Sequence, residues 1–188
     1  NKNNKEFFQN LFNECSNLMQ TIMHLSQPVI AEVCGIAAAA GCQLVASCDL
    51  AVASENASFM TPGVNIGLFC STPMVAVSRN ISRKKIMEML LTGESMSAKD
   101  AVDYGLINHC VPDNQLQDKT MSLANLIASK PISTVKIGKE AFYKQVEMPI
   151  SEAYNYTSEV MAKNMLELDA HEGISAFLEK RRADFPGE

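Results

Sequence analysis

The sequence predicts an α/β fold in which an α/β portion is followed by a helical C-terminal portion. Two nearly continuous apolar runs, at residues 29–34 and 49–53, are typical of strands that are buried on both faces. Helical periodicity dominates the later part of the chain. A chain of 188 residues can bury a substantial core. We divide it into an α/β core at residues 1–112 and a helical region at residues 113–188.

Charge and cysteine usage limit the classes of function. The formal net charge is −5 and no basic run stands out, which argues against a nucleic-acid partner. No apolar stretch reaches the ~20 residues that a membrane span needs, so we expect none. The six cysteines form no Cys-x-x-Cys pair and have no His at ligand spacing. We therefore expect no metal site and a reducing, intracellular compartment.

The first part of the chain is predicted to alternate between helix and strand. Residues 6–25 place apolar side chains on one stripe at helical spacing, which predicts an amphipathic helix. Pro28 ends that element. Strands are expected at residues 29–34, 49–53 and 58–60, and a short helix is expected after Ala40.

Helical signals become frequent after Pro73. Residues 81–91 are periodic and are followed by Gly93 as a stop signal. Ser97-Ala98-Lys99-Asp100 resembles a capping box and predicts a helix that ends at Gly105. A strand is expected at residues 106–111, ended by Pro112. The remaining helices are expected at residues 114–129, 131–146, 151–166 and 169–182.

Small residues fill the turn between the first strand and the short helix. Residues 35–41 contain nothing larger than alanine except Ile36, so a ligand can approach the backbone closely. The N-terminus of the following helix favours negative charge. This combination suits an oxyanion hole, in which a backbone N–H meets charge that develops on a carbonyl oxygen. Gln43 follows the turn, and an amide is neither an acid nor a base.

Motifs along nearly the whole chain resemble the enoyl-CoA hydratase/isomerase family, also called the crotonase superfamily. The motifs that carry the resemblance are Pro28-Val29-Ile30-Ala31, Ala40-Gly41-Cys42-Gln43-Leu44, Cys48-Asp49-Leu50-Ala51, Phe59 with Pro62, Gly67, Glu88-Met89-Leu90-Leu91-Thr92-Gly93, Ser97-Ala98, Ala101 with Gly105-Leu106, and residues 172–181. The resemblance implies a crotonase-like spiral of ββα units with a helical C-terminal trimerisation region.

The resemblance also implies a ligand and a mode of binding. Family members bind acyl-CoA thioesters in lipid metabolism and stabilise the enolate with two backbone N–H groups, without a further cofactor. One of these groups maps onto Ala40. The other lies in an earlier segment of the family fold that this sequence does not show. The N-terminal part of that fold, roughly 70 residues at about 25–35 residues per spiral turn, is therefore expected to be missing from these 188 residues.

Both carboxylates of the hydratases are replaced in this sequence. The resemblance places the two hydratase glutamates at Gln43 and Gly63. A positioned general acid or base typically contributes ~10²–10⁴-fold in rate. We therefore expect little hydration of enoyl-CoA.

Several nearby residues are candidates for the pocket. These are Pro62, Asn65, Leu68, Phe69 and Cys70. A thiol near a helix N-terminus can be a nucleophile, and Cys70 is such a candidate. The alternative is that Ser71 or Thr72 simply caps the next helix.

Asp49 is the nearest acid in the motif region. It is either a substitute base or, as we favour, a carboxylate that backbone N–H groups satisfy.

The C-terminal helix is expected to contribute to a neighbouring subunit. Phe177 and Lys180 match the positions from which family members contact CoA that is bound mainly by the next subunit. A charge-assisted contact from Lys180 to a CoA phosphate is one interpretation, and an exposed basic helix end is the other. The resemblance implies a homotrimer or a dimer of trimers. It also implies the mitochondrial matrix in a eukaryote or the cytoplasm in a bacterium.

Three functional hypotheses follow. The first is an acyl-CoA-binding protein in which hydration is weak or absent. The second is an active enzyme of another type, such as an isomerase or a thioesterase, with a base from Asp49 or from the earlier segment. The third is a structural or regulatory subunit of an oligomer that catalyses nothing.

Overall fold

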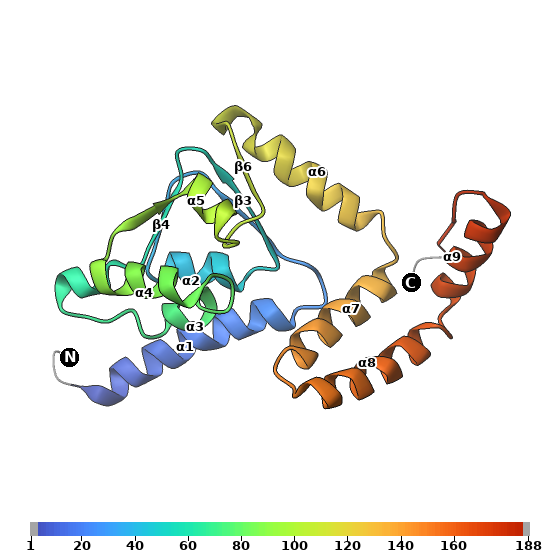
Figure 1. The fold of residues 1–188 in the computed structure, drawn as a ribbon, viewed down its shortest axis with the longest axis horizontal. Coiled ribbons are helices and arrows are strands. Elements are labelled where there is room, and N and C mark those ends of the chain that lie inside the picture. Colours follow the sequence, from blue (N-terminus) through green and yellow to red (C-terminus); the bar gives the residue numbers. More distant parts are fainter. Residues whose placement is uncertain (1–3, 186–188) are drawn as a thin grey trace. The chain divides into compact units, whose positions relative to one another are not determined.

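The computed structural model describes residues 4–185 and forms two compact units (Figure 1). The spiral unit comprises the chain up to Leu25 together with Val29–Leu123, and the helical unit comprises Ser26–Pro28 and the chain from Ala124 onward. The division falls inside a helix and not after residue 112, where the sequence analysis placed it. Leu116 and Thr120 from the first half of this helix are buried, which explains why that half belongs with the spiral unit.

Helix α1 (Lys5–His24) opens the spiral unit. Its N-cap is Asn4, whose side-chain oxygen accepts from the Phe7 N–H at 3.2 Å. Helix α1 packs against α2 (Ala40–Ser47). Only Met19 of its apolar stripe is buried, and the large side chains nearer the N-terminus stay exposed. The helix was predicted correctly, but most of its apolar stripe finds no core within the spiral unit.

Two strands and a helix make up each turn of the spiral. In the first turn β1 (Ile30–Val33) and β2 (Ile36–Ala38) lead into α2. In the second, β3 (Leu50–Ser54) and β4 (Ser58–Met60) lead into the next helices. β1 pairs in parallel with β3, and β2 pairs in parallel with β4. Equivalent strands of successive turns therefore lie side by side in two separate sheets, which is the geometry of a ββα spiral.

The third turn completes both sheets. β5 (Ser95–Ser97) pairs antiparallel with β4, and β6 (His109–Val111) pairs in parallel with β3. Between β4 and β6 lie the short helices that connect these strands. They are η1 (Pro62–Ile66), α3 (Pro73–Val77), α4 (Arg83–Thr92) and α5 (Ala98–Asp103).

Three short elements were not predicted from the sequence, and two element boundaries were misjudged, one of them the end of the helix expected at 169–182, which ends at Glu179. The sequence analysis did not predict β2, β5 or η1, which are only three to five residues long and carry no periodic pattern. The expected strand at 106–111 begins only at His109, because the N–H groups of Leu106 and Ile107 donate to the carbonyl of Ala101 and form a turn. The predicted cap of α5 is confirmed, since the Asp100 N–H donates to the Ser97 hydroxyl at 3.1 Å.

One hydrophobic core fills the spiral unit. It joins residues from both sheets and from α2, α3, α4 and α5. Phe59 and Val77 of this core are completely buried. Ala39, in the turn between β2 and α2, packs against this core.

The helical unit consists of helices and loops. Its elements are the second half of α6 (Leu116–Ala128), α7 (Ile132–Gln145), α8 (Ile150–Asn164) and α9 (Leu168–Glu179). α7 contacts both α8 and α9. The Ser133 hydroxyl donates to the Asp169 carboxylate at 2.5 Å, and Lys144 lies 4.5 Å from the centre of the Tyr156 ring. Among residues 4–185, no helix is long and apolar enough to cross a membrane.

Candidate functional site

The turn between β2 and α2 holds its backbone in a strained conformation. Ala39, the N-cap of α2, has φ 48° and ψ −111°, which residues with a Cβ rarely adopt. Such a conformation costs on the order of 1–3 kcal/mol. The Ala39 N–H donates to the carbonyl of Met60 at the end of β4, at 2.9 Å. This bond fixes the turn against the neighbouring strand.

The first turn of α2 presents backbone donors beyond that strained residue. The helical hydrogen bonds begin with the Gln43 N–H, which donates to the Ala39 carbonyl at 3.0 Å. The N–H groups of Ala40, Gly41 and Cys42 come before it, where an α-helix supplies no acceptor. Ala40 is exposed and carries only a methyl group. The arrangement favours a negatively polarised oxygen at the Ala40 N–H.

Gln43 is buried against α1. Gln43 is only 4% exposed, and the Cys15 thiol of α1 donates to the Gln43 Oε1 at 3.9 Å. The Gln43 carbonyl accepts from the Ser47 hydroxyl at 2.8 Å. A neutral amide suits this neutral environment, whereas an ionised carboxylate would lose its hydration there.

Gly63 lies in η1 directly against Cys70. The Gly63 N–H donates to the Cys70 Sγ at 3.3 Å, and the Gly63 carbonyl accepts from the Leu68 N–H at 2.9 Å. Gly63 and Cys70 are buried, whereas Leu68 is exposed. The structure thus brings three of the predicted site residues together in one tight turn.

Cys42 links α2 to this turn. Burial raises the pKa of its thiol to about 12, nearby Cys70 raises it as well, and a hydrogen bond with the Met60 backbone opposes the rise. The Cys42 thiol therefore stays protonated at neutral pH and is neither an acid nor a base in that range.

Thr61 is a polar residue of this region that the sequence analysis did not single out. It is completely buried, and its Oγ1 has no hydrogen-bond partner among the described residues. A buried hydroxyl without a partner costs roughly 1–3 kcal/mol. The sequence around Thr61 gives no sign that its hydroxyl is buried in this way. Only the packing of the structure reveals it.

The other candidate pocket residues spread over the surface around η1. Pro62 is half-buried, and Leu68 and Phe69 are 62% and 44% exposed. Asn65 is exposed, and its side chain lies against Gly93 at the end of α4. A Cβ added to Gly93 would lie 2.6 Å from the Asn65 Nδ2. Asn65 therefore packs on Gly93, the αL cap of α4.

Asp49 has a structural role in the spiral. Its carboxylate accepts from the Val29 N–H at 2.7 Å, and its own N–H donates to the Val29 carbonyl at 3.0 Å. These bonds join the starts of β1 and β3. The favoured interpretation, a carboxylate satisfied by backbone N–H groups, is confirmed.

The expected capping by Ser71 or Thr72 is wrong. Thr72 is the N-cap of α3, but its side chain makes no capping hydrogen bond. The Ser71 hydroxyl instead donates to the Phe69 carbonyl at 3.4 Å. Pro73 follows at the first helical position, where its fixed φ starts the helix without a side-chain cap.

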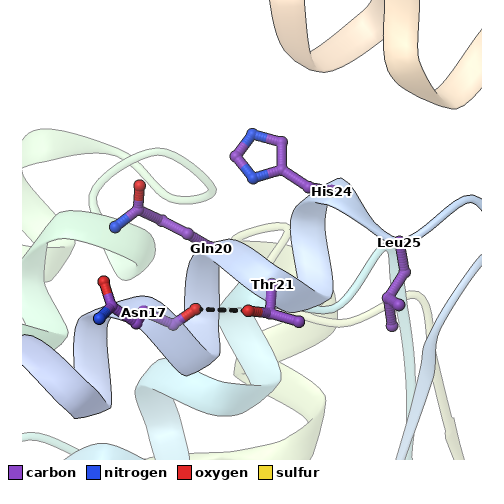
Figure 2. A pocket seen from close by; sticks show the side chains of 5 residues that line it. All are labelled: Asn17, Gln20, Thr21, His24 and Leu25. Carbon is purple, nitrogen blue, oxygen red and sulfur yellow. Dashed lines mark hydrogen bonds between the residues drawn. The ribbon is translucent and has the colours of Figure 1, made fainter.

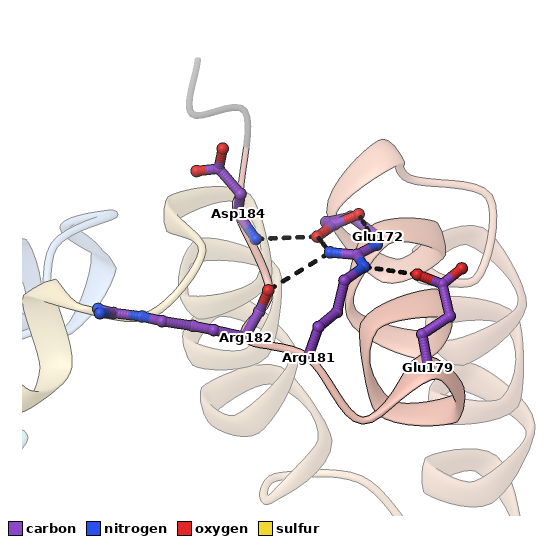
Figure 3. Close-up of polar contacts among 5 residues, drawn as sticks. All are labelled: Glu172, Glu179, Arg181, Arg182 and Asp184. Carbon is purple, nitrogen blue, oxygen red and sulfur yellow. Dashed lines mark hydrogen bonds and ion pairs between the residues drawn. The ribbon is translucent and has the colours of Figure 1, made fainter.

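Phe177 and Lys180 lie at the end of α9, and both are exposed. Lys180 ends the helix in the left-handed conformation, with φ 55°. The next residue, Arg181, forms ion pairs with Glu172 at 2.5 Å and Glu179 at 2.6 Å (Figure 3). Arg181 is thereby ion-paired within the helical unit.

A shallow hollow of about 430 Å³ lies elsewhere, along the C-terminal half of α1 (Figure 2). Its lining residues, Asn17, Gln20, Thr21, His24 and Leu25, all come from the end of this one helix. Side chains of a single helix face cannot enclose a ligand on several sides, so this hollow is not the candidate site. Among residues 4–185, no group of His, Cys, Asp and Glu could hold a metal ion.

Comparison with protein families identifies the group to which this arrangement belongs. The model of the family described as enoyl-CoA hydratase/isomerase matches residues 1–188. The chain belongs to the enoyl-CoA hydratase/isomerase family. The fold is accordingly the crotonase fold, as the sequence analysis expected.

Several individual members of the enoyl-CoA hydratase/isomerase family are similar to this chain in sequence and in structure. Human "Enoyl-CoA hydratase domain-containing protein 3, mitochondrial" is 51% identical over 178 residues, which are 95% of this chain and 59% of the human protein. The crystal structure of that human protein matches with a TM-score of 0.94 at 49% identity, over 97% of this chain and 72% of the other. A Mycobacterium smegmatis enoyl-CoA hydratase structure matches with a TM-score of 0.96 at 50% identity, over 97% of this chain and 71% of the other.

These relatives are longer than the chain described here, which spans 59% of the length of the human protein. The stretch at residues 61–73 resembles the same domain-containing protein 3, and the comparison confirms that likeness. The relatives from human, Xenopus laevis and Danio rerio carry the word mitochondrial in their names.

Proposed function

We propose that the site binds acyl-CoA thioesters and holds the thioester oxygen at the Ala40 N–H, without the proton transfers of a hydratase. The observation that carries this proposal is the neutral character of the two positions that face such a ligand in the family. Gln43 is a buried amide bonded to a thiol, and Gly63 has no side chain. The nearby Cys42 thiol, whose pKa is about 12, also holds its proton.

Hydration requires a base that activates water and an acid that delivers a proton to carbon. None of Gln43, Gly63 and protonated Cys42 can take a proton at neutral pH. The strained turn at Ala39 and the open N–H of Ala40 still supply an electrostatic grip on a carbonyl oxygen. Binding and polarisation of the thioester are therefore retained in this proposal, and proton transfer is not.

The first experiment measures binding and turnover on the same preparation. Calorimetry with acetyl-CoA and butyryl-CoA should detect binding by the full-length protein. Hydration of crotonyl-CoA should run at least ~10²–10⁴-fold below a typical enzyme rate of ~10 s⁻¹. Turnover near that typical rate, or no binding at millimolar ligand, contradicts the proposal.

Infrared spectroscopy tests the proposed hydrogen bond from the Ala40 N–H to the thioester oxygen. Hydrogen bonds to a thioester oxygen weaken its C=O bond, so the infrared stretch of a ¹³C-labelled thioester should move to lower wavenumber on binding. An unshifted carbonyl band in the bound ligand would show that the oxygen lies elsewhere.

Phe177 and Lys180 are proposed to contact CoA that is bound by a neighbouring subunit. Both are exposed at the end of α9, and an ammonium group suits a phosphate. Lys180→Gln should weaken acyl-CoA binding roughly tenfold, because a charged hydrogen bond contributes about 1.5–3 kcal/mol. Arg182→Gln is the matched control, and an equal loss in both variants would indicate a general charge effect.

The helical unit is proposed to assemble the protein into a homotrimer or a dimer of trimers. Large apolar side chains on α7, α8 and α9 stay exposed, among them Phe142 and Tyr154 at 57% and 69%. Contiguous exposed apolar surface marks interaction sites. Light scattering coupled to size exclusion should give a trimeric or hexameric mass, and a monomer at micromolar concentration would contradict this assembly.

A further inference from the structure

Four residues of α1 form one narrow stripe along the helix. Phe8, Phe12, Cys15 and Met19 follow one another at helical spacing, so their side chains lie on one face. The burial of the stripe changes along its length: Met19 is 6% exposed, Cys15 is half-buried, and Phe12 and Phe8 are 47% and 42% exposed. The face of α1 that packs on the spiral unit at Met19 is therefore left largely uncovered by the described residues at its two phenylalanines.

Two contacts tie α1 to α2 at separate points. The Cys15 thiol, in the middle of α1, donates to the Gln43 Oε1 in the first turn of α2. Beyond the C-terminal ends of both helices, the Val29 N–H donates to the Asp49 carboxylate at 2.7 Å. The first contact fixes one point along the pair of helices, and the second fixes where the chain goes after each of them.

These contacts determine that α1 and α2 run in the same general direction. From Cys15 to Leu25 the helix advances about 15 Å, and from Gln43 to Asp49 the chain advances about 8 Å. If the helices ran in opposite directions, these advances would separate Leu25 from Asp49 by more than about 20 Å. The four-residue step from Leu25 to Val29, which is bonded to Asp49, spans at most about 14 Å. Only the same direction satisfies that limit.

The exposed end of the stripe therefore reaches past the N-terminal end of α2. Phe12 lies about one turn before Cys15, just as Ala40 lies about one turn before Gln43, so Phe12 comes roughly level with Ala40. Phe8 lies about 6 Å farther out along α1. The N–H of Ala40 points out of this same end of α2. The two exposed rings thus border the space into which the Ala40 N–H points.

The wall formed by these rings is ordered on its outer side. The Phe7 ring packs edge-to-face against the Phe8 ring, with 5.5 Å between the ring centres and 74° between the planes. A backbone donor next to an apolar wall is the combination that sites for small amphipathic ligands offer. A thioester that bonds to Ala40 through its oxygen can lay its alkyl chain along α1, first over Phe12 and then over Phe8.

We propose that Phe8 and Phe12 determine the preferred length of the acyl chain, and that the site takes medium-chain rather than short-chain acyl-CoA thioesters. The proposal rests on the function proposed above, because it requires a thioester oxygen at the Ala40 N–H. A butyryl chain ends near Phe12, whereas a decanoyl chain covers both rings, whose Cα atoms are about 6 Å apart along the helix. Burial of the longer chain against the rings supplies the preference.

Calorimetry with the full-length protein tests the preference for chain length. Decanoyl-CoA should bind roughly 50-fold more tightly than butyryl-CoA, because six further methylenes, each half-buried, contribute about a factor of two each. Phe8→Ala combined with Phe12→Ala should reduce this ratio to roughly fivefold or less. Both rings are exposed, so the variant should keep the helical circular dichroism of the unaltered protein.

Leu18→Ala is the matched control. Leu18 also lies on α1 and is 54% exposed, but it follows Cys15 in the chain and so lies away from the open end of α2. This variant should keep the full ratio. A ratio near one in the unaltered protein overturns the proposal, and so does an equal fall of the ratio in Leu18→Ala. Butyryl-CoA binding without a gain for the longer chain would leave the proposed function standing and reject only the preference.

A photolabel locates the chain without any substitution. Decanoyl-CoA that carries a diazirine at the end of its chain should, on irradiation, label α1 within residues 5–12, as read by mass spectrometry of peptides. Excess decanoyl-CoA without the diazirine should suppress this label. Labelling confined to other elements overturns the proposal, and binding of butyryl-CoA decides independently on the proposed function.

Discussion

The two units of the chain are stabilised in different ways. The spiral unit buries large side chains such as Phe59, Met89 and Val77 in one core. In the described part of the helical unit the buried residues are three alanines, Ala141, Ala153 and Ala176. Burial of a large apolar side chain contributes about 1.5–3 kcal/mol, and burial of an alanine methyl contributes much less. The spiral unit thus carries its own stability, whereas the helical unit relies on surface contacts and, as proposed, on other subunits.

The candidate site lies on the better-stabilised spiral unit. The strained conformation of Ala39 persists because the surrounding spiral fixes it, through the bond to Met60 and the core behind the turn. A strained turn of this kind needs a rigid support, and the helical unit offers none of comparable density. Matched substitutions in the two units test this difference in stability.

The largest difference is expected for buried and exposed aromatic residues. Phe59→Ala should lower the free energy of unfolding by about 3–5 kcal/mol, because it leaves a cavity in the core. Phe142→Ala, in α7, removes a ring that is 57% exposed and should cost about 0.5 kcal/mol or less in the isolated protomer. Urea unfolding followed by circular dichroism measures both. Similar losses would show that Phe142 is covered by a partner or that the core is looser than described.

The two non-glycine residues with positive φ give the next largest effects among residues 4–185. Ala39→Gly should stabilise the spiral unit by about 1–2 kcal/mol, since its φ of 48° and ψ of −111° suit only glycine well. Lys180→Gly, at the αL end of α9, should gain about 1 kcal/mol. Differential scanning calorimetry of both variants orders these gains, and a loss of stability in Ala39→Gly would contradict the strain.

Substitutions at helix N-caps should change the stability of the two units by smaller amounts. Ser97→Ala removes the bond to the Asp100 N–H and should cost about 1 kcal/mol. Thr72→Ala is its control within the spiral unit and should change stability by less than about 0.5 kcal/mol, because its side chain caps nothing. In the helical unit Glu167 is the N-cap of α9 without a side-chain bond, so Glu167→Ser should gain about 0.5–1 kcal/mol. A gain from Glu167→Ser below measurement error would show that α9 is already stabilised by another contact.

The smallest effect concerns the ion-pair cluster of the helical unit. Hydrogen bonds from Arg181 and from the Asp184 N–H lower the pKa of Glu172 from 4.5 to about 2 (Figure 3). Because the folded-state pKa is lowered, this contribution to stability is complete above about pH 4.5 and fades as the pH falls toward 2. Carboxyl NMR titration should show the pKa of Glu172 returning toward 4.5 in Arg181→Gln. Arg182→Gln, whose side chain points away from Glu172, should leave that pKa low.

Much of the fold could be predicted from local patterns. Apolar runs marked β1 and β3, helical periodicity marked α1 and α4, and the Ser97 capping box marked the start of α5. The elements that were missed, β2, β5 and η1, are short and are formed by pairing with distant strands or by contact with Cys70. No window of neighbouring residues contains that information.

The candidate site was predictable in its chemistry but not in its packing. The motif positions gave Ala40, Gln43 and Gly63, together with the loss of both carboxylates. Cys15 meets Gln43 because of the way α1 packs, and the Thr61 Oγ1 is buried without a hydrogen-bond partner among residues 4–185; nothing in the sequence indicated either feature.

The sequence by itself determined the family, the order of the longer helices and of the strands β1, β3, β4 and β6, and the absence of an acid or base at positions 43 and 63, because these follow from residue identity and local periodicity. Only the tertiary structure decided why position 63 is a glycine. Its backbone conformation would allow a side chain, but the Leu68 carbonyl oxygen and the Cys70 Sγ would lie 2.8 Å and 2.9 Å from a Cβ at this position. Such exclusion of one atom by another is a property of packed volume, which no one-dimensional pattern records.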